Sequence, residues 1–335
     1  MLAVRLHGIG DLRLEEVPVP DPGPGEILVR VAAAGICGTD RHLFKGEFPS
    51  APPVTLGHEF AGTVVGRGAG VDVPEGALVT CDPNDWCGRC DACLRGKVNL
   101  CASNVATGIH RDGGFAEYAV FPAGKAVVLP VDLDPERGAF CEPLACTLHG
   151  VDIGNPRPGE RVLVIGGGVI GLLALQLAAL AGAEVLLLTR NPGKRALAAT
   201  IGAAATAGDA AGVRAVWPEG ADLTLECAGV PETVAEAGGL TRAGGRVVVL
   251  GVLPRGERVA IEPFDHLVRE VQLYFSYINP FTQTRAAELI ARGRVAVAPL
   301  VSRRIPLAEA MEAIASPARA GEVKVMVVPA SARGI

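Results

Sequence analysis

Residues 161–171, RVLVIGGGVIG, join a short apolar run to three glycines with the spacing Gly166-x-Gly168-x-x-Gly171. A helical pattern, LLALQLAALAGA, and a second apolar run, EVLLLTR, follow directly. A strand, a glycine turn and a helix in this order are typical of a unit that binds a dinucleotide. Glycines permit the tight turn and the close approach of the backbone to a pyrophosphate, which then meets the free N–H groups of the helix N-terminus. A glycine-rich turn without a ligand is the alternative.

The rhythm around this segment predicts an α/β protein with two domains. After residue 156 short apolar runs alternate with helical patterns, which favours a parallel sheet covered by helices. Before residue 151 the chain is β-rich, with alternating runs such as EILVRVAAAG between turn clusters such as PVPDPGPGE. From about residue 281, two helical patterns and the strand pattern EVKVMVV are expected to return to the first domain. We therefore predict a first domain of residues 1–151 and 281–335 and a second of residues 152–280.

Composition narrows the class of partner. The chain has 335 residues, of which 49% are hydrophobic and 20% charged, as in a globular protein with a sizeable core. A net charge of -5 without a dense basic run argues against nucleic acid and anionic membranes, and so favours a small-molecule substrate. The N-terminus does not resemble a signal peptide, which predicts a cytoplasmic protein. Residues 169–188 imitate a membrane span, but Gly182 and Glu184 divide them into a helix and a strand.

Cofactor preference is expected at the end of the second strand, LLLTRN. Arg190 stands where an Asp or Glu would accept hydrogen bonds from the adenosine ribose. A guanidinium cannot accept them but can pair with a 2′-phosphate, and Lys194 and Arg195 add positive charge nearby. The pattern favours NADP, with NAD as the alternative. The candidate cofactor-binding residues are Gly166, Gly168, Val169, Ile170, Gly171, Arg190, Arg195, Leu250 and Val252.

Four cysteines gather in residues 87–101, CGRCDACLRGKVNLC: Cys87, Cys90, Cys93 and Cys101. Nine cysteines in a reducing compartment argue against disulfides and favour metal ligation for this cluster. Four thiolates suit a closed, tetrahedral zinc site. An iron–sulfur cluster is the rival, but its bacterial spacing places the fourth cysteine after three residues, followed by proline. Cys81, Cys141, Cys146 and Cys227 are expected to be packing residues.

A second constellation is dispersed: GICGTDRH contributes Cys37, TLGHEF contributes His58 and Glu59, and FCEPLACTLHG contributes Glu142. Each residue alone is a weak signal. Their occurrence together in one β-rich domain, beside a dinucleotide-binding pattern, favours a metal centre.

These motifs, together with DGGFAEY, ECAG and RVVVLG, resemble those of the zinc-dependent medium-chain dehydrogenase/reductase family, in its polyol and threonine dehydrogenase branch. The resemblance covers essentially the whole chain. It implies a GroES-like catalytic domain interrupted by a Rossmann domain, an active site between them, and a homodimer or homotetramer. It also implies that the four-cysteine segment holds a structural zinc ion.

The resemblance implies a role for each residue of the dispersed set. Cys37 matches the thiolate ligand of a catalytic zinc ion, His58 the imidazole ligand and Glu59 the adjacent carboxylate. Glu142 matches a second glutamate that reaches the metal directly or through water. Thr39 resembles a proton-relay hydroxyl, and His42 either passes the proton onward or is a surface loop residue.

The expected function is hydride transfer between a secondary alcohol of a polyol, sugar or cyclitol and NAD(P), with NADP favoured. Two departures from the family pattern limit this expectation. Arg190 replaces the acid of NAD-using members, and Ser276 with Tyr277 replaces an Arg-Tyr pair found near the substrate in some animal polyol dehydrogenases. An L-threonine 3-dehydrogenase and a non-catalytic dinucleotide-binding relative are the alternatives.

Overall fold

The computed structural model describes residues 1–329 and divides into two compact units. The first comprises residues 1–143 and 279–293 and the chain from 301 onward; the second comprises residues 144–278 and 294–300. The domain boundaries that the sequence predicts, 151/152 and 280/281, stay a prediction. The end of its range 281–335, residues 330–335, lies outside the described residues.

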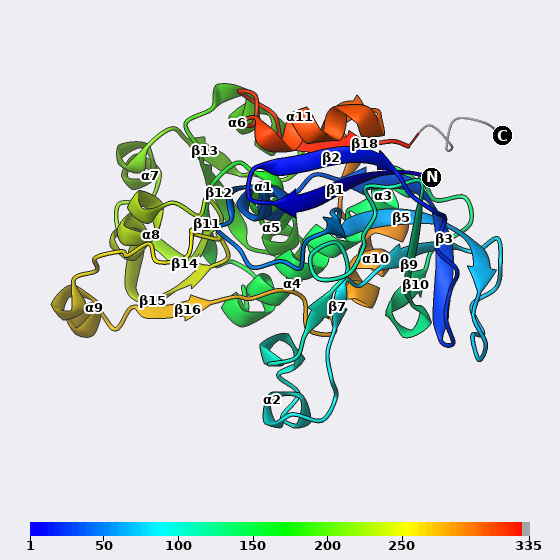
Figure 1. Cartoon of the computed structure of the whole chain (residues 1–335). Helices are drawn as coiled ribbons and strands as arrows, with labels where there is room; N and C mark the ends of the chain where they lie inside the picture. The colour runs from blue at the N-terminus through cyan, green and yellow to red at the C-terminus, as the bar shows by residue number, and fades with distance from the viewer. Residues whose placement is uncertain (330–335) are drawn as a thin grey trace. The chain divides into compact units, whose positions relative to one another are not determined.

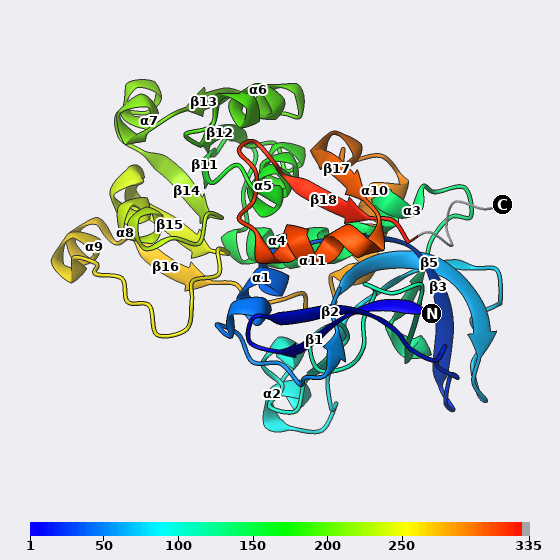
Figure 2. The same cartoon turned by 45° about the horizontal axis from the view of Figure 1, so that its top comes forward.

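The first unit is built on a seven-stranded sheet with the order β10-β6-β5-β3-β18-β17, and β9 pairs with the other end of β3. Strand β3 (Glu26–Gly35) is the longest, and its buried and half-buried residues alternate as the sequence pattern predicts. The parallel strands β17 and β18 come from the end of the chain and lie side by side (Figure 2). The remaining strands of this sheet are β5 (Glu59–Arg67), β6 (Leu78–Cys81), β9 (Tyr118–Pro122), β10 (Ala126–Val128), β17 (Val301–Ile305) and β18 (Lys324–Val327).

Smaller elements complete this unit. A three-stranded sheet has the order β2-β1-β4. Phe60 and Phe121 pack edge to face in the core with ring centroids 5.5 Å apart, an arrangement that aromatic pairs prefer. The elements are β1 (Leu2–Gly8), β2 (Asp11–Glu16), β4 (Val54–Thr55), α1 (Gly38–Lys45), α3 (Pro135–Ala139), α10 (Gln283–Ala291) and α11 (Ala310–Ala315).

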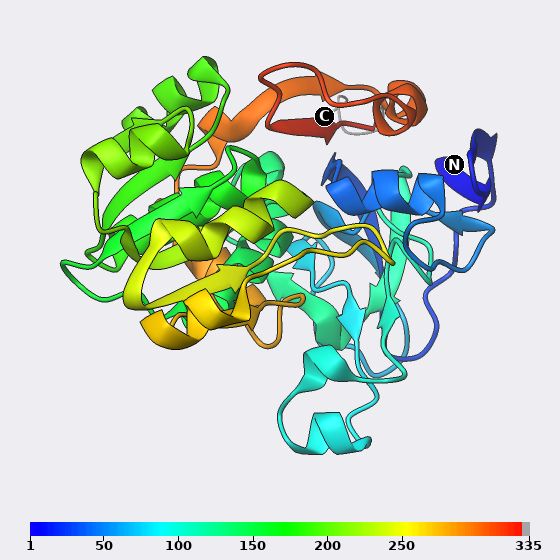
Figure 3. The ribbon, with the colours of Figure 1, turned by 90° about the vertical axis from the view of Figure 1, so that its left-hand side faces the viewer.

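The four-cysteine segment forms a small lobe, here defined as residues 84–106, that projects from the first unit (Figures 1 and 3). It contains the paired strands β7 (Asn84–Asp85) and β8 (Val105–Ala106), the short helix α2 (Asp91–Leu94) and the 3-10 turn η1 (Val98–Leu100). Leu94 and Leu100 are exposed, and Val98 is one of few buried apolar residues. The lobe therefore has little hydrophobic core of its own.

The second unit contains a six-stranded parallel sheet with the order β13-β12-β11-β14-β15-β16 (Figure 1). This is the order of a doubly wound dinucleotide-binding sheet, and it confirms the predicted α/β class. The strands are β11 (Arg161–Ile165), β12 (Glu184–Leu188), β13 (Ala205–Ala207), β14 (Ala221–Glu226), β15 (Thr241–Val249) and β16 (Gln272–Phe275). The helices are α5 (Val169–Leu180), α6 (Pro192–Thr200), α7 (Ala210–Val216), α8 (Pro231–Ala237) and α9 (Pro263–Arg269), while α4 (Cys141–Gly154) begins in the first unit.

The apolar stretch at residues 169–188 is divided as predicted. Helix α5 ends at Leu180, Gly182 adopts a φ of +87°, and β12 begins at Glu184. Within residues 1–329 we find no helix with both the length and the apolar character needed to cross a bilayer.

Candidate metal centres and cofactor site

The pairing of β3 with β5 brings the first set of ligand residues together. The last residue of β3, Gly35, lies opposite Glu59, the first residue of β5, so Cys37 and His58 lie just beyond the paired ends. One ligand atom each from Cys37, His58 and Glu59 lies within 4.8 Å of the others. A Cβ atom on Gly35 would lie 2.3 Å from Glu59 Oε2, so a side chain there would displace the Glu59 carboxylate.

Asp40 organises this set, although the sequence analysis did not single it out. Its Oδ2 accepts a hydrogen bond from the Cys37 backbone N–H (2.8 Å), and its Oδ1 lies 3.5 Å from His58 Nδ1. The side chains of Asp40 and His58 are buried. Burial disfavours the charged imidazole, but the nearby Asp40 and Cys37 outweigh it and raise the pKa of His58 well above its usual value. A metal cation at this site would displace that proton.

The donor set fits a zinc ion. A thiol, an imidazole and a carboxylate are the ligand types that zinc accepts in catalytic sites, where a fourth position stays open. Glu59 is 1% exposed, and its Oε1 is buried without a hydrogen-bond partner, so this oxygen is available to a cation. Glu142 is buried at the start of α4, but its carboxylate is not part of the group of atoms within 4.8 Å. Its assignment as a ligand stays a prediction.

The two predicted relay residues lie on α1, which begins directly after Cys37. Thr39 Oγ1 is 3.6 Å from Cys37 Sγ, which places this hydroxyl at the metal-ligand set. His42 belongs to the helix, not to a loop, and its Nδ1 lies 2.6 Å from Glu47 Oε2. A carboxylate in this position orients the ring and supports a proton on Nδ1.

Lys324, the first residue of β18, was not found by sequence analysis. Its Nζ lies 2.5 Å from Glu59 Oε2 and donates to the carbonyl oxygen of Ile36 at 3.1 Å. The side chain is 1% exposed. Burial opposes its positive charge, but Glu59 and Cys37 together raise the pKa of Lys324. No local pattern marks a lysine in a closing strand as a partner of a residue 265 positions earlier.

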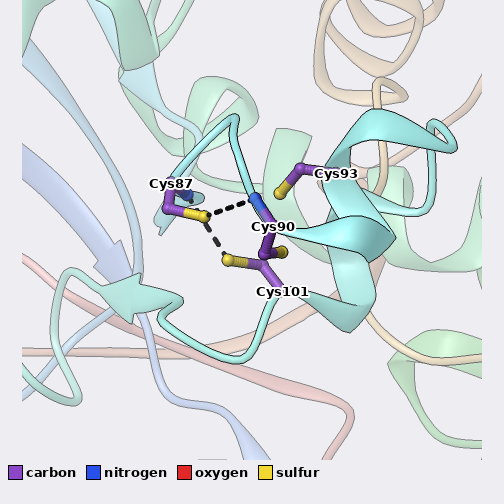
Figure 4. Close-up of side chains that lie close together, drawn as sticks. All are labelled: Cys87, Cys90, Cys93 and Cys101. Atoms are coloured by element: carbon purple, nitrogen blue, oxygen red, sulfur yellow. Dashed lines mark hydrogen bonds between the residues drawn. The ribbon is translucent and has the colours of Figure 1, made fainter.

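The lobe brings its four thiols together as the spacing predicts (Figure 4). The sulfur atoms of Cys87, Cys90, Cys93 and Cys101 all lie within 4.8 Å of one another, and none of the nine cysteines, which all lie in the described residues, forms a disulfide. Cys87 Sγ accepts a hydrogen bond from the Cys90 N–H (3.4 Å), and Cys101 Sγ accepts one from the Cys87 N–H (3.4 Å). Hydrogen bonds from backbone N–H groups of Arg89 and Cys90 lower the pKa of the Cys87 thiol to about 6. Four sulfurs at this separation fit a tetrahedral metal site.

The glycine motif lies at the carboxyl end of β11 in the second unit. Gly166 has a φ of +107°, and a Cβ on Gly171 would lie 1.9 Å from the Gly166 carbonyl oxygen, so both positions require glycine. Gly168 precedes α5 and has open space where a side chain would lie. Val169 and Ile170 form the first turn of α5, whose N–H groups lack partners within the helix. A tight turn at Gly166, open space at Gly168 and close packing at Gly171 are the three roles that glycines have in a turn that binds pyrophosphate.

The basic residues lie where the sequence predicts them, after β12. Arg190 is exposed, whereas Lys194 and Arg195 are half-buried on α6. Arg195 Nη1 donates to the carbonyl oxygens of Thr189 (2.8 Å) and Arg190 (3.0 Å). The guanidinium of Arg195 is thereby held beside the β12 end, which is the edge that faces an adenosine ribose in sheets of this order.

Leu250 and Val252 follow β15 at the same sheet edge, since Ile165, Glu226 and Val249 are in register across the three strands. Glu226 was missed by the sequence analysis. This buried carboxylate accepts hydrogen bonds from the N–H groups of Ala228 (2.8 Å) and Gly229 (3.0 Å) and so holds the loop after β14. Burial raises its pKa. The acid at the end of the strand pattern DLTLE, directly before the turn CAG, was the available signal.

Comparison with known families and proteins agrees with this geometry. Residues 23–131 match the alcohol dehydrogenase GroES-like domain, and residues 169–292 match the zinc-binding dehydrogenase domain. A solved structure from Sinorhizobium meliloti 1021, described as a zinc-binding dehydrogenase bound to NADP, is 55% identical, with a TM-score of 0.96. The match covers 98% of this chain and 99% of that one.

Two curated relatives have named substrates. D-arabinitol dehydrogenase 1 of Uromyces fabae is 34% identical over 331 residues, which cover 95% of this chain and 94% of the relative. L-threonine 3-dehydrogenase of Thermococcus kodakarensis is 35% identical over 267 residues, which cover 76% of this chain and 75% of the relative. The chain therefore belongs to the zinc-dependent medium-chain dehydrogenase/reductase family, in its polyol and threonine dehydrogenase branch, and is an NAD(P)-dependent alcohol dehydrogenase.

Proposed function

We propose that the protein oxidises a secondary alcohol of a polyol, sugar or cyclitol, with NADP as the preferred hydride acceptor. The observation that carries this proposal is the set Cys37, His58 and Glu59, whose ligand atoms lie within 4.8 Å of one another and of which His58 and Glu59 are buried. The similarity to an arabinitol dehydrogenase supports the substrate class, and the similarity to a structure bound to NADP supports the cofactor.

The reaction removes a hydride and a proton from the alcohol, and different residues of this chain are proposed to bind the metal and to transfer the proton. Zinc, when bound by Cys37, His58 and Glu59, supplies a Lewis acid that lowers the pKa of the alcohol oxygen. The Thr39 hydroxyl is proposed to accept the departing proton and donate its own onward, and its distance of 3.6 Å from Cys37 Sγ supports this role. His42, whose Nδ1 lies beside Glu47, is the candidate for holding that proton next. Glu142 is proposed to act on the same metal, directly or through water.

The cofactor is proposed to bind in the second unit. Its pyrophosphate would meet the turn at Gly166, Gly168 and Gly171 and the first N–H groups of α5, where Val169 and Ile170 lie. Arg190 and Arg195 would face the 2′-phosphate, while Leu250 and Val252 would line the nicotinamide end.

The lobe is proposed to hold a second zinc ion with a structural role. Four thiolates leave no open position for a substrate, and the lobe has few buried apolar residues to stabilise it otherwise.

The test of the overall function is the rate of reduced-nicotinamide formation with the zinc-loaded protein. The substrate panel contains polyols, sugars, cyclitols, simple secondary alcohols and L-threonine, each with NADP and with NAD. We expect turnover of a polyol or cyclitol with NADP. Preferred turnover of L-threonine would instead favour the second candidate, a threonine dehydrogenase, which the Thermococcus kodakarensis relative supports. Absence of turnover throughout the panel would contradict both.

A matched pair of variants separates the two proposed metal sites. Cys37→Ser should reduce bound zinc from about two ions per chain to about one and abolish turnover, with little change in the thermal unfolding midpoint. Cys93→Ser should lose the other ion and make the lobe sensitive to protease, while folded protein still turns over. Metal analysis, kinetics and limited proteolysis report the three quantities. Full activity in Cys37→Ser would refute the proposed mechanism.

Arg190→Ala tests the basis of cofactor choice. Loss of a charge-assisted contact should lower kcat/KM for NADP by at least about tenfold and change that for NAD by less than about threefold. Arg242→Ala is the control, because Arg242 is an exposed arginine near the start of β15, at the other end of the strands, where it pairs with Asp222. Equal losses with both cofactors would contradict the assignment of Arg190.

We also propose that the chain forms a homodimer or homotetramer through β16. This strand ends the order of the parallel sheet in the described chain and exposes 68% of Phe275. The neighbouring helix α9 exposes Phe264, Leu267 and Val268. An apolar strand edge can pair with its own copy about a two-fold axis.

Light scattering tests this assembly. The wild-type protein should show at least about twice the mass of one chain, and Phe275→Glu should shift the population towards monomer because a carboxylate would be buried in the interface. Val131→Glu, which changes an exposed apolar residue of the first unit, is the control. A wild-type monomer would contradict the proposal.

A further inference from the structure

A buried ion pair joins the first metal-ligand set to the last described strand. Lys324 and Glu59 are each 1% exposed, and their charged atoms lie 2.5 Å apart. A buried charge costs several kcal/mol unless a partner offsets it. Lys324 supplies that partner for Glu59, and it also donates to the Ile36 carbonyl oxygen.

The backbone around the pair is shaped to permit this contact. Gly35 lies opposite Glu59 in the β3–β5 pairing, and a Cβ there would lie 2.3 Å from Glu59 Oε2 and 3.3 Å from Lys324 Cδ. Strand β18 pairs with the end of β3, which places Lys324 beside the same strand end. Three separate segments therefore converge on one carboxylate oxygen.

The two oxygens of Glu59 have different surroundings. Oε2 accepts a hydrogen bond from Lys324 Nζ, whereas Oε1 is buried without a hydrogen-bond partner. One carboxylate oxygen of Glu59 lies within 4.8 Å of ligand atoms of Cys37 and His58. A cation at the ligand set would thus share Glu59 with an ammonium group that is already in place. The positive charge of the ammonium offsets the negative charge of the carboxylate and repels a second cation.

We propose that Lys324 is a positioning residue that competes with the metal for Glu59: it stabilises the metal-free site and weakens metal binding. The lysine allows Glu59 to be buried before a cation arrives, and it holds Oε2 of that carboxylate. This inference rests on the proposed metal site at Cys37, His58 and Glu59.

The experiment compares zinc affinity with the stability of the metal-free full-length protein. Lys324→Gln removes the charge but keeps a hydrogen-bond donor, and Lys324→Arg keeps the charge. Zinc dissociation constants come from competition with a chromophoric chelator, and Cys37→Ser identifies the zinc that belongs to the four-cysteine lobe.

We expect Lys324→Gln to bind zinc at the first site at least about tenfold more tightly, which corresponds to about 1.4 kcal/mol. Its metal-free form should unfold at a lower temperature than the wild-type protein, and zinc should recover most of that loss. Lys324→Arg should resemble the wild-type protein in both measurements. In a Glu59→Gln background the effect of Lys324→Gln should shrink, because the shared carboxylate is gone.

The outcomes separate this inference from the proposed function. If Cys37→Ser loses no zinc, the metal site itself is wrong. If that zinc is lost but Lys324→Gln binds zinc with unchanged or weaker affinity, Lys324 is only a structural partner and the inference is overturned. A Lys324→Gln protein that folds only with zinc, and then binds it more tightly, would support the inference.

Discussion

The antiparallel pairing of β3 with β5 is the constraint on which the first ligand set depends. Each strand supplies candidate ligands only at its end, Cys37 after β3 and His58 with Glu59 at the start of β5, so the register decides whether the three meet. A slip of one residue would turn Glu59 to the other face of the sheet. Gly35 is part of the same constraint, because any side chain there would occupy the position of the carboxylate.

The second unit obeys a simpler rule. In a parallel sheet every strand ends at the same edge, so residues that follow β11, β12 and β15 lie along that edge whatever their separation in sequence. This is why the glycine motif and Arg190 could be assigned from the sequence pattern to the ends of two strands at one sheet edge. The alternation of apolar runs and helical patterns predicted the sheet itself. Helix α9 was not expected, since it contains exposed apolar residues and its apolar pattern has no buried side.

The first unit was less predictable because its contacts are distant in sequence. The spacing of clustered residues such as Cys87 and Cys101 predicts a metal site. Asp40 could have been found from its place three residues after Cys37, where an acid caps the start of a helix. Lys324 gives no such sign, because its partner Glu59 is reached only through the pairing of β18 with β3. Local sequence patterns do not predict an ion pair between residues that only the fold brings together.

The sparse core of the lobe has a consequence for local opening. Amide hydrogens within a cooperative core exchange with solvent only as often as that core unfolds. Residues 84–106 have few buried apolar side chains and are therefore not part of such a core. With the proposed zinc ion bound, the lifetime of their closed state would be set by the lifetime of sulfur–metal bonds. Hydrogen exchange in the lobe would follow the supply of free metal, independently of the stability of the sheets from which it projects.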